Sequence, residues 1–483
     1  MTRARTAVSV ACLLCSALFV SLPQAQQPPD RSKPPALGPA PALDLPSIQK
    51  RALSNGLPVW IVEAHKVPLA QVNLVVMAGS NDDPAGKFGA ANLTAAMLDE
   101  GAGARSALEI ADAVDYLGAE LVTTSSSDSS AVRLNVPVAR LRDALPIMAD
   151  VAIRPTFPVQ DLERLRQERL TALIQARDDP AQIIPLAFQR VVFGAAHRYG
   201  TGQAGTEGTL KTFTADDLKT FHTAMYQPSN ATLIVVGDIT PDDAARRATA
   251  LFGGWTRGTV PAVRYPTARA SGATTVYLVD KPGAAQSSVR IGSIGVARST
   301  SDYFALQVLN TILGGSFTSR LNNNLRETHA YTYGANSRFD MRRQAGPFAA
   351  GAEIVTAKTD SALVQFMKEL AAIRDTIPTT ELEKAKQYLQ LQLPGDFETT
   401  GDIASQLVPV VVYGLPLDYY NGYVQSIGAI TQADVQRVAR QYLDPAKMAV
   451  VIVGDRKTIE PGIRALNLGT VVVRDATGKT IAP

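Results

Sequence analysis

The sequence is poor in the residues that bind metal ions and cross-link exported proteins. Its 483 residues include two cysteines, Cys12 and Cys15, and four histidines. The histidines are His65, His197, His222 and His329. No two of them stand at the short spacing that places zinc ligands on one helix face. A disulfide scaffold is therefore excluded, and a metal site built on this chain's own histidines is not expected.

The sequence also lacks an excess of charge of one sign. The net charge is +3, only 19% of residues are charged, and no long run of one sign occurs. A nucleic-acid-binding protein usually shows a concentrated basic patch, so we expect no nucleic-acid partner. Apolar residues make up 46% of the chain, which is the balance of a globular protein with an ample core.

Long hydrophobic runs are absent after the first apolar segment. Two arginines precede an apolar stretch from Ala7 to Leu22, and the small residue Ala25 follows it. This pattern is typical of a secretory signal peptide, here residues 1–25, and no later stretch approaches the roughly 20 apolar residues of a membrane helix. We expect a periplasmic, cysteine-free mature chain that begins with a Pro-rich spacer over 26–47. An uncleaved N-terminal anchor is the alternative.

The chain carries one pattern twice, 217 residues apart. The segment 214–238 opens with TADDL and ends in VVGD, and the segment 431–455 opens with TQADV and ends in IVGD. The same offset places 58–63 over 275–280. A shared offset at distant segments indicates a tandem duplication. We predict an N-terminal repeat over 48–257, a linker over 258–271 and a C-terminal repeat over 272–483.

Periodicity predicts a mixture of strands and helices. Strands are expected at Pro58–Glu63, Ala70–Met77, Ala131–Pro137 and Thr232–Val236. Helices are expected at Ala90–Leu98, Ser106–Leu117, Asp161–Arg177 and Ala215–Met225, the last with Thr214 and Asp217 as a helix-start cap. Because strands and helices do not alternate strictly, the fold class is α+β, with a mostly antiparallel sheet in each repeat packed against helices.

Several segments resemble the pitrilysin/insulinase family of metallopeptidases. They are Asn55-Gly56-Leu57, Met77–Ser80, Gly89–Met97, the charged segment Asp161–Pro180, Tyr199-Gly200 after His197, and Ser319-Arg320-Leu321 followed by Leu325-Arg326-Glu327. The resemblance covers nearly all of the mature chain. It implies two homologous α+β repeats, as in the halves of the metallopeptidase clam-shell.

The family's zinc motif is missing. Active members carry H-x-x-E-H on a first-repeat helix, where two histidines one turn apart bind zinc and the glutamate acts as general base. By resemblance, Asn92, Ala95 and Ala96 take these three positions. Gln175 stands where a distal ligand glutamate is expected, and Glu168 matches an accessory carboxylate. Alanine has no lone pair and neutral amides bind zinc poorly, so we expect no metal bound by this chain.

An arginine and a tyrosine of the family's second repeat are kept. Active members contribute an arginine and, seven residues later, a tyrosine, and Arg326 and Tyr333 have this spacing. A guanidinium and a phenol can donate hydrogen bonds to a peptide backbone and to a developing oxyanion. Thr328-His329-Ala330-Tyr331 replaces the family's basic-glycine segment, which makes Tyr331 a rival to Tyr333. A surface ion pair for Arg326 and an ordinary strand aromatic for Tyr333 are the competing interpretations.

The loss of the zinc motif, together with the retention of the arginine and the tyrosine, favours a non-catalytic subunit of a heterodimeric zinc metalloendopeptidase. The resemblance implies a partner subunit that carries H-x-x-E-H and zinc, while this chain supplies Arg326 and Tyr333 in trans. The expected substrate is a peptide or a small unfolded segment. The alternative is a proteolytically inactive peptide-binding or scaffold homodimer in the periplasm.

Three further features predict ordinary structure. Gly314-Gly315-Ser316 lacks the Gly-Lys-Ser/Thr ending of a phosphate loop and predicts a helix break or close packing. The serine-rich run 125–130 has no G-x-S-x-G turn and predicts a strand or hairpin edge. Asp99-Glu100 predicts a solvated turn.

Overall fold

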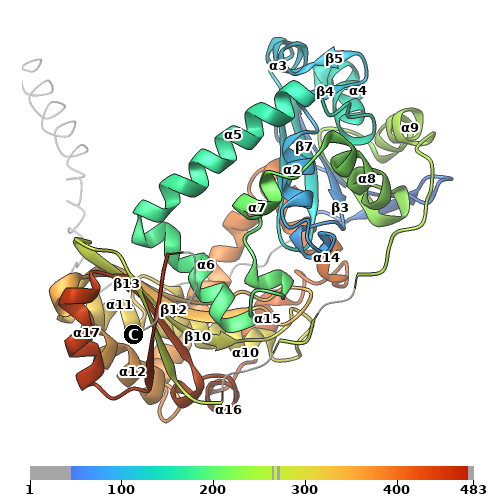
Figure 1. Cartoon of the computed structure of the whole chain (residues 1–483). Helices are drawn as coiled ribbons and strands as arrows, with labels where there is room; N and C mark the ends of the chain where they lie inside the picture. Colours follow the sequence, from blue (N-terminus) through green and yellow to red (C-terminus); the bar gives the residue numbers. More distant parts are fainter. Residues whose placement is uncertain (1–44, 264–265, 269–271, 477–483) are drawn as a thin grey trace, which may run out of the picture. The chain divides into compact units, whose positions relative to one another are not determined.

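The structure is a computed structural model that describes residues 45–263, 266–268 and 272–476 (Figure 1). The predicted signal peptide, most of the predicted spacer, and parts of the predicted linker lie outside these residues. Within the described ranges, no helix has the length and apolar character needed to cross a bilayer.

Six strands of the N-terminal repeat form one sheet in the order β1-β2-β8-β3-β7-β6. The strands are β1 Gln49–Ala52, β2 Pro58–Glu63, β3 Leu69–Val76, β6 Glu120–Ser125, β7 Ser130–Pro137 and β8 Ala231–Gly237. β2 and β8 pair in parallel, and the other neighbours are antiparallel. A small hairpin of β4 (Gly101–Ala102) and β5 (Arg105–Ser106) stands apart from this sheet.

Six strands of the C-terminal repeat form a second sheet in the order β11-β12-β10-β13-β9-β14. The strands are β9 Thr275–Asp280, β10 Gln286–Ile294, β11 Thr332–Phe339, β12 Pro347–Val355, β13 Ala449–Gly454 and β14 Thr470–Arg474. β9 pairs in parallel with both β13 and β14. The remaining neighbours are antiparallel.

The 217-residue offset is visible in the pairing of the strands. Val59 pairs with Leu233 in the first sheet, and Val276 pairs with Val450 in the second, so both partners are shifted by the same 217 residues. The two sheets also share one strand order when the second is read from β14 to β11. They differ in the first edge strand, because β1 comes from the start of the N-terminal repeat and β14 comes from the end of the C-terminal repeat. The predicted α+β fold of two homologous, mostly antiparallel repeats is therefore confirmed.

The helices of the two repeats also correspond. Those of the N-terminal repeat are α2 Ala90–Ala96, α3 Ala107–Tyr116, α4 Leu141–Ile153, α5 Val159–Gln175, α6 Pro180–Phe193, α7 Glu207–Leu210, α8 Ala215–Met225 and α9 Pro241–Phe252. Those of the C-terminal repeat are α10 Tyr303–Asn310, α11 Arg320–Asn322, α12 Thr359–Ala372, α13 Thr379–Gln392, α14 Thr400–Tyr413, α15 Tyr423–Gly428, α16 Gln432–Tyr442 and α17 Arg456–Ala465. The strands and helices predicted from periodicity all form, with ends that agree to within two residues.

Equivalent helix starts use the same chemistry in both repeats. The Thr214 hydroxyl accepts a hydrogen bond from the Asp217 amide at 3.2 Å, and the Asp217 carboxylate accepts one from the Thr214 amide at 2.9 Å. Thr431 and Asp434 repeat this arrangement at the start of α16. These capping boxes satisfy amides that the first helical turn leaves without partners, and they confirm the cap predicted at Thr214.

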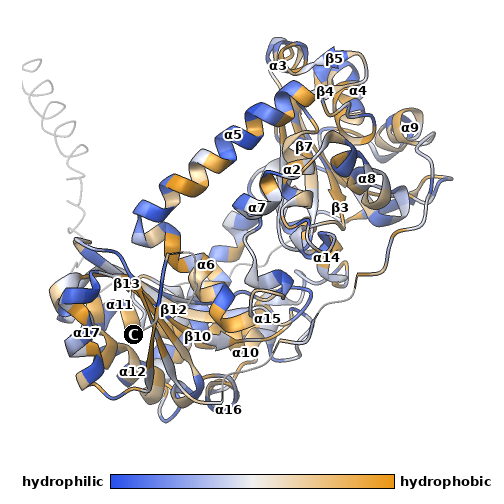
Figure 2. Cartoon of the chain, in the orientation of Figure 1, coloured by the Kyte–Doolittle hydropathy of each residue, from blue (hydrophilic) through white to orange (hydrophobic). Residues whose placement is uncertain are grey.

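One helix of each repeat packs on the sheet of the other repeat. Phe188 and Phe193 of α6 pack with Val451 and Val453 of the second sheet. Reciprocally, side chains of α14 such as Leu407 pack on one face of the first sheet, against β2, β3 and β8. The central strands β8 and β13 are buried along their whole length and almost wholly apolar, whereas most of α5 is hydrophilic (Figure 2). This exchange makes the two repeats parts of one packed structure.

Candidate functional site

The degenerate zinc-motif helix is α2, a short and largely buried helix. Asn92 and Ala96, one turn apart, are half-buried, and Ala95 is buried. The chain enters α2 through Gly89 at φ 97°, a left-handed conformation that favours glycine. The Asp83 carboxylate accepts hydrogen bonds from the amides of Gly89 and Ala91 at 2.6 and 2.8 Å. Burial raises the pKa of Asp83 to about 7, although these amides oppose the shift.

The long helix α5 carries the two predicted carboxylate positions. Its Arg169 donates a hydrogen bond to the Asn92 carbonyl at 3.3 Å, which joins α5 to α2. Burial lowers the pKa of this guanidinium. Glu168 is exposed and pairs with Arg164 at 3.0 Å, and Gln175 is the exposed last residue of α5. The hydrogen bond from α5 to α2 thus comes from Arg169 rather than from Glu168 or Gln175.

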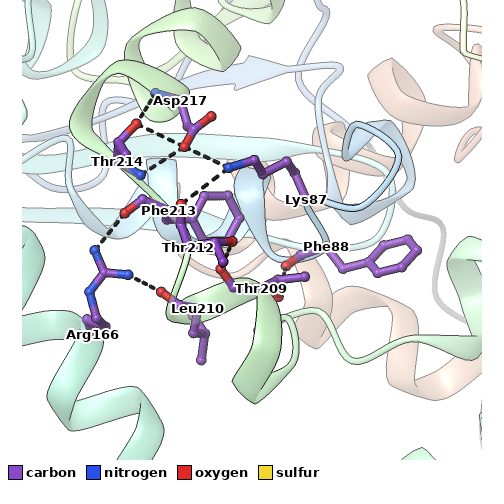
Figure 3. Close-up of polar contacts among 9 residues, drawn as sticks. All are labelled: Lys87, Phe88, Arg166, Thr209, Leu210, Thr212, Phe213, Thr214 and Asp217. Atoms are coloured by element: carbon purple, nitrogen blue, oxygen red, sulfur yellow. Dashed lines mark hydrogen bonds and ion pairs between the residues drawn. The ribbon is translucent and has the colours of Figure 1, made fainter.

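A network of polar contacts fixes α5 and the segment before α2 to residues 209–217 (Figure 3). The buried Arg166 of α5 donates to the carbonyls of Leu210 and Phe213, the latter at 2.6 Å. From the other side, Lys87 pairs with Asp217 at 2.8 Å. The positions of α5 and of the segment before α2 are therefore fixed by side chains that are not metal ligands.

The Asp99-Glu100 pair is not the solvated turn predicted from the sequence. Both residues are half-buried, and burial raises the pKa of Asp99. Glu100 forms an ion pair with Arg164 of α5. The segment after α2 is therefore linked to α5. The prediction was wrong because α5 provides an arginine with which Glu100 pairs.

The residues at the degenerate positions do not fit the zinc ion that the family implies. Amide and methyl side chains stand at all four positions: Asn92, Ala95, Ala96 and Gln175. Over the part of the chain that the structure describes, no three or more His, Cys, Asp and Glu side chains gather as a metal site. Each histidine has another environment.

Each of the four histidines contacts a different partner. His65 pairs with Asp238 at 2.6 Å, and His197 accepts a hydrogen bond from the Tyr199 amide at 3.0 Å. His222 is buried and donates to the Ala152 carbonyl at 2.9 Å. His329 stacks on Tyr331 with ring centroids 5.0 Å apart.

Arg326 lies in a π-helical segment, η7, which spans Asn323–Thr328. Its guanidinium stands over the ring of Phe317, 4.5 Å from the centroid, and its Nε lies 3.5 Å from a Glu327 carboxylate oxygen. The Arg326 side chain is 35% exposed and Phe317 is 66% exposed. Arg326 is thus an accessible cation that rests on an accessible aromatic ring.

Tyr333 lies at an irregularity at the start of β11. The pairing of β11 with β12 shifts between Thr332 and Ala335, which places Tyr333 and Gly334 in a β-bulge. The Thr332 hydroxyl closes this bulge with hydrogen bonds to the Gly334 carbonyl and from the Gly334 amide, at 3.0 and 3.1 Å. Bulges redirect side chains out of a sheet's regular alternation, and Tyr333 is 90% exposed.

The rival tyrosine has a different environment. Tyr331 is half-buried, packs against the core of the C-terminal repeat and stacks on His329. Between Arg326 and Tyr331 the chain turns through Ala330, which holds a left-handed φ of 53° and whose amide donates to the Arg326 carbonyl at 3.0 Å. The accessible phenol is therefore that of Tyr333.

The glycine pair and the serine run are structural, as predicted. A Cβ on Gly314 would lie 2.3 Å from the Ser337 amide nitrogen, so the segment Thr311–Gly315 packs directly on β11. The serine run forms the turn between β6 and β7. Its Asp128 is buried and accepts a hydrogen bond from the Arg343 amide of the C-terminal repeat at 3.0 Å.

Sequence reasoning missed two residues beside Arg326 and Tyr333. Phe317 forms the aromatic surface under Arg326, and the buried Asn322 bonds to the main chain on both sides of η7. The available signals were a lone aromatic in a polar stretch and an asparagine directly after Arg320-Leu321. Neither signal specifies a role without the contacts.

Comparisons with known proteins place these features in one family. Residues 59–193 match the family model for insulinase (peptidase family M16), and residues 212–389 match the model for the peptidase M16 inactive domain. An uncharacterized zinc protease of Mycobacterium leprae is 28% identical over 86% of this chain and 94% of its own length. A non-peptidase homolog of Helicobacter pylori is 21% identical over 83% of this chain and 92% of its own length.

Solved structures agree with this relationship. The crystal structure of a peptidase M16 inactive domain from Pseudomonas fluorescens is 26% identical, with a TM-score of 0.79, and covers 84% of this chain and 98% of its own. With two family models on successive segments and the same fold over most of the chain, the protein belongs to the insulinase (M16) peptidase family as a member without the zinc-binding motif.

Proposed function

We propose that this chain is a non-catalytic subunit of a two-chain zinc metalloendopeptidase of the periplasm, and that it supplies Arg326 and Tyr333 in trans to the active site of its partner. The observation that carries the proposal is a contrast between the two repeats. The N-terminal repeat keeps the frame of α2 and α5 without metal ligands, whereas the C-terminal repeat presents an accessible guanidinium and an accessible phenol.

The chemistry of the pair suits peptide bond hydrolysis. An arginine and a tyrosine can donate hydrogen bonds to the substrate backbone and to the oxyanion that forms on the scissile carbonyl. Cation–π contact with Phe317 limits the orientations open to the Arg326 side chain. A partner chain with H-x-x-E-H would provide the metal and the general base. The substrate would be a peptide or a short unfolded segment.

A second candidate is a peptide-binding or scaffold homodimer that performs no proteolysis. The resemblance to a non-peptidase homolog in Helicobacter pylori supports this candidate. The two candidates differ in whether a zinc-bearing chain accompanies this one.

Co-purification from the native source tests the proposal. The tagged full-length chain should bring with it a second family member that carries H-x-x-E-H and about one zinc per complex. The complex should cleave quenched-fluorescent peptides, and the partner separated from this chain should lose most of that activity. Recovery of a homodimer alone, without zinc and without peptidase activity, would reject the proposal and favour the homodimer candidate.

A further inference from the structure

Asn322, the last residue of α11, joins two segments that meet beside η7. Its side-chain amide nitrogen donates to the Phe317 carbonyl at 2.6 Å. Its side-chain oxygen accepts a hydrogen bond from the Ala335 amide at 3.2 Å. The residue is only 4% exposed, so both ends of a buried amide are used within the protein.

Each of the two joined segments presents one member of the Arg/Tyr pair. Phe317 provides the ring on which the Arg326 guanidinium rests, 4.5 Å from the centroid. Ala335 is the residue at which β11 resumes its pairing with β12 after the bulge that exposes Tyr333. The Asn322 side chain therefore lies between the support of the guanidinium and the support of the phenol.

We propose that Asn322 is a positioning residue that holds Arg326 and Tyr333 as one preorganised pair of donors for a peptide backbone, by joining the Phe317 segment to the bulge in β11. This inference rests on the proposed function, because it assigns Asn322 a role in the same site. Asn322 does not touch the substrate in this proposal and acts only through the other two residues.

Without the Asn322 link, the two donor side chains would have more conformational freedom. Tyr333 is 90% exposed, and Arg326 is 35% exposed and rests on Phe317, so the placement of the two donors depends on the bulge and on the Phe317 segment. Donors stabilise an oxyanion best when they are already oriented before the charge develops. A buried amide with both of its hydrogen-bonding groups satisfied is rigid, and it transmits that rigidity to the two main-chain segments.

The neighbouring Asn324 offers a matched control. It belongs to η7 and is half-buried, and its amide nitrogen donates to the Glu369 carboxylate at 2.6 Å and to the Gln365 side chain at 3.2 Å. These partners lie on α12 and not on the segments of Phe317 or Ala335. Loss of the Asn324 amide should therefore disturb η7 without uncoupling the donor pair.

A mutant cycle in the co-purified complex tests the inference. Asn322→Ala should lower kcat/KM for a quenched-fluorescent peptide about 10-fold, with most of the loss in kcat, whereas Asn324→Ala should change it less than about 2-fold. In the Arg326→Ala/Tyr333→Phe background, Asn322→Ala should have almost no further effect, because the groups it positions are gone. An equal fold-loss in both backgrounds, or full activity of Asn322→Ala, would overturn the inference.

A replacement variant and the double variant on its own distinguish failure of the Asn322 role from failure of the proposed function. If Asn322→Ala yields no folded chain, Asn322→Ser replaces it in the same cycle with the same expectations, because the shorter side chain keeps a polar group in the buried position but cannot span from the Phe317 carbonyl to the Ala335 amide. If Arg326→Ala/Tyr333→Phe itself leaves turnover unchanged, the proposed function fails. If that double variant is impaired while Asn322→Ser is fully active, only the role of Asn322 fails.

Discussion

Arg169 of α5 donates a hydrogen bond from its guanidinium to the main-chain carbonyl of Asn92 on α2, at 3.3 Å. This contact joins the two helices that carry the zinc ligands in active family members. The contact uses a backbone oxygen, so it does not depend on which side chain stands at position 92. The frame of the site can therefore persist after its ligands are lost.

The first prediction concerns metal content. The purified full-length chain should contain well under one equivalent of zinc by inductively coupled plasma mass spectrometry, because amides and methyl groups occupy the four ligand and base positions. The zinc-bearing partner, treated in the same buffers, is the positive control. One equivalent of zinc that survives dialysis against a weak chelator would contradict the assignment of these positions.

The second prediction concerns the pair proposed to act in trans. Arg326→Ala or Tyr333→Phe should lower peptide cleavage by the complex about 10-fold or more, as expected for the loss of an oxyanion donor. Arg246→Ala and Tyr116→Phe are matched controls, because both residues are strongly exposed on helices of the other repeat. Turnover that is unchanged in the Arg326 and Tyr333 variants would reject the contribution in trans.

The third prediction concerns the helices exchanged between repeats. Phe188 of α6 is buried against β13 strand residues of the C-terminal repeat, so Phe188→Ala should destabilise the fold by about 3–5 kcal/mol. Urea unfolding followed by circular dichroism measures the change. Phe317→Ala removes an equal side chain that is 66% exposed and should cost much less. Equal destabilisation by the two variants would show that the α6 contact is not part of the core.

The fourth prediction concerns the turn between Arg326 and Tyr333. Ala330 holds a φ of 53°, where a side chain is strained by about 1–2 kcal/mol. Ala330→Gly should relieve this strain and raise the free energy of unfolding by up to about 1 kcal/mol, since the flexibility of unfolded glycine offsets part of the gain. Ala335→Gly, in β11, should be destabilising. A loss of stability in Ala330→Gly would contradict the strain argument.

Elements with strong local periodicity were predictable from the sequence. The predicted bounds of β2 and α8 agree with the structure residue for residue, because each of these segments has a regular apolar pattern of its own. The role of α6 was not predictable, since its apolar face contacts strands more than 250 residues away in the sequence, such as Val451. Local patterns do not encode which distant surface an apolar helix covers.

The candidate site was likewise predictable only in part. The spacing of Arg326 and Tyr333 could be found in the sequence, because it belongs to a family motif. The roles of Phe317 and Asn322 depend on a ring placed under a guanidinium and on an amide placed between two segments. Such arrangements follow from the fold around η7 and have no regular spacing along the chain.

The fifth prediction concerns the pH dependence of stability at His222. Burial lowers the pKa of His222 to about 4, below its ordinary value of 6.5, while the unfolded chain keeps the ordinary value. The neutral ring is therefore favoured by folding, and its contribution is complete above pH 6.5 and lost as the pH falls from 6.5 toward 4. Relative to His222→Gln, the wild type should lose about 3 kcal/mol of unfolding free energy between pH 7.5 and pH 4.

The control for this prediction is a histidine with the opposite shift. Hydrogen bonds to Asp238 and Glu63 raise the pKa of the exposed His65, so its contribution is complete below pH 6.5 and declines as the pH rises through the raised value. The difference between wild type and His65→Gln should therefore change in the opposite direction across the same pH range. Urea unfolding at pH 7.5, 6 and 4 measures both differences. If the His222 difference stays constant with pH, His222 titrates normally in the folded state and the ring is not held neutral by burial.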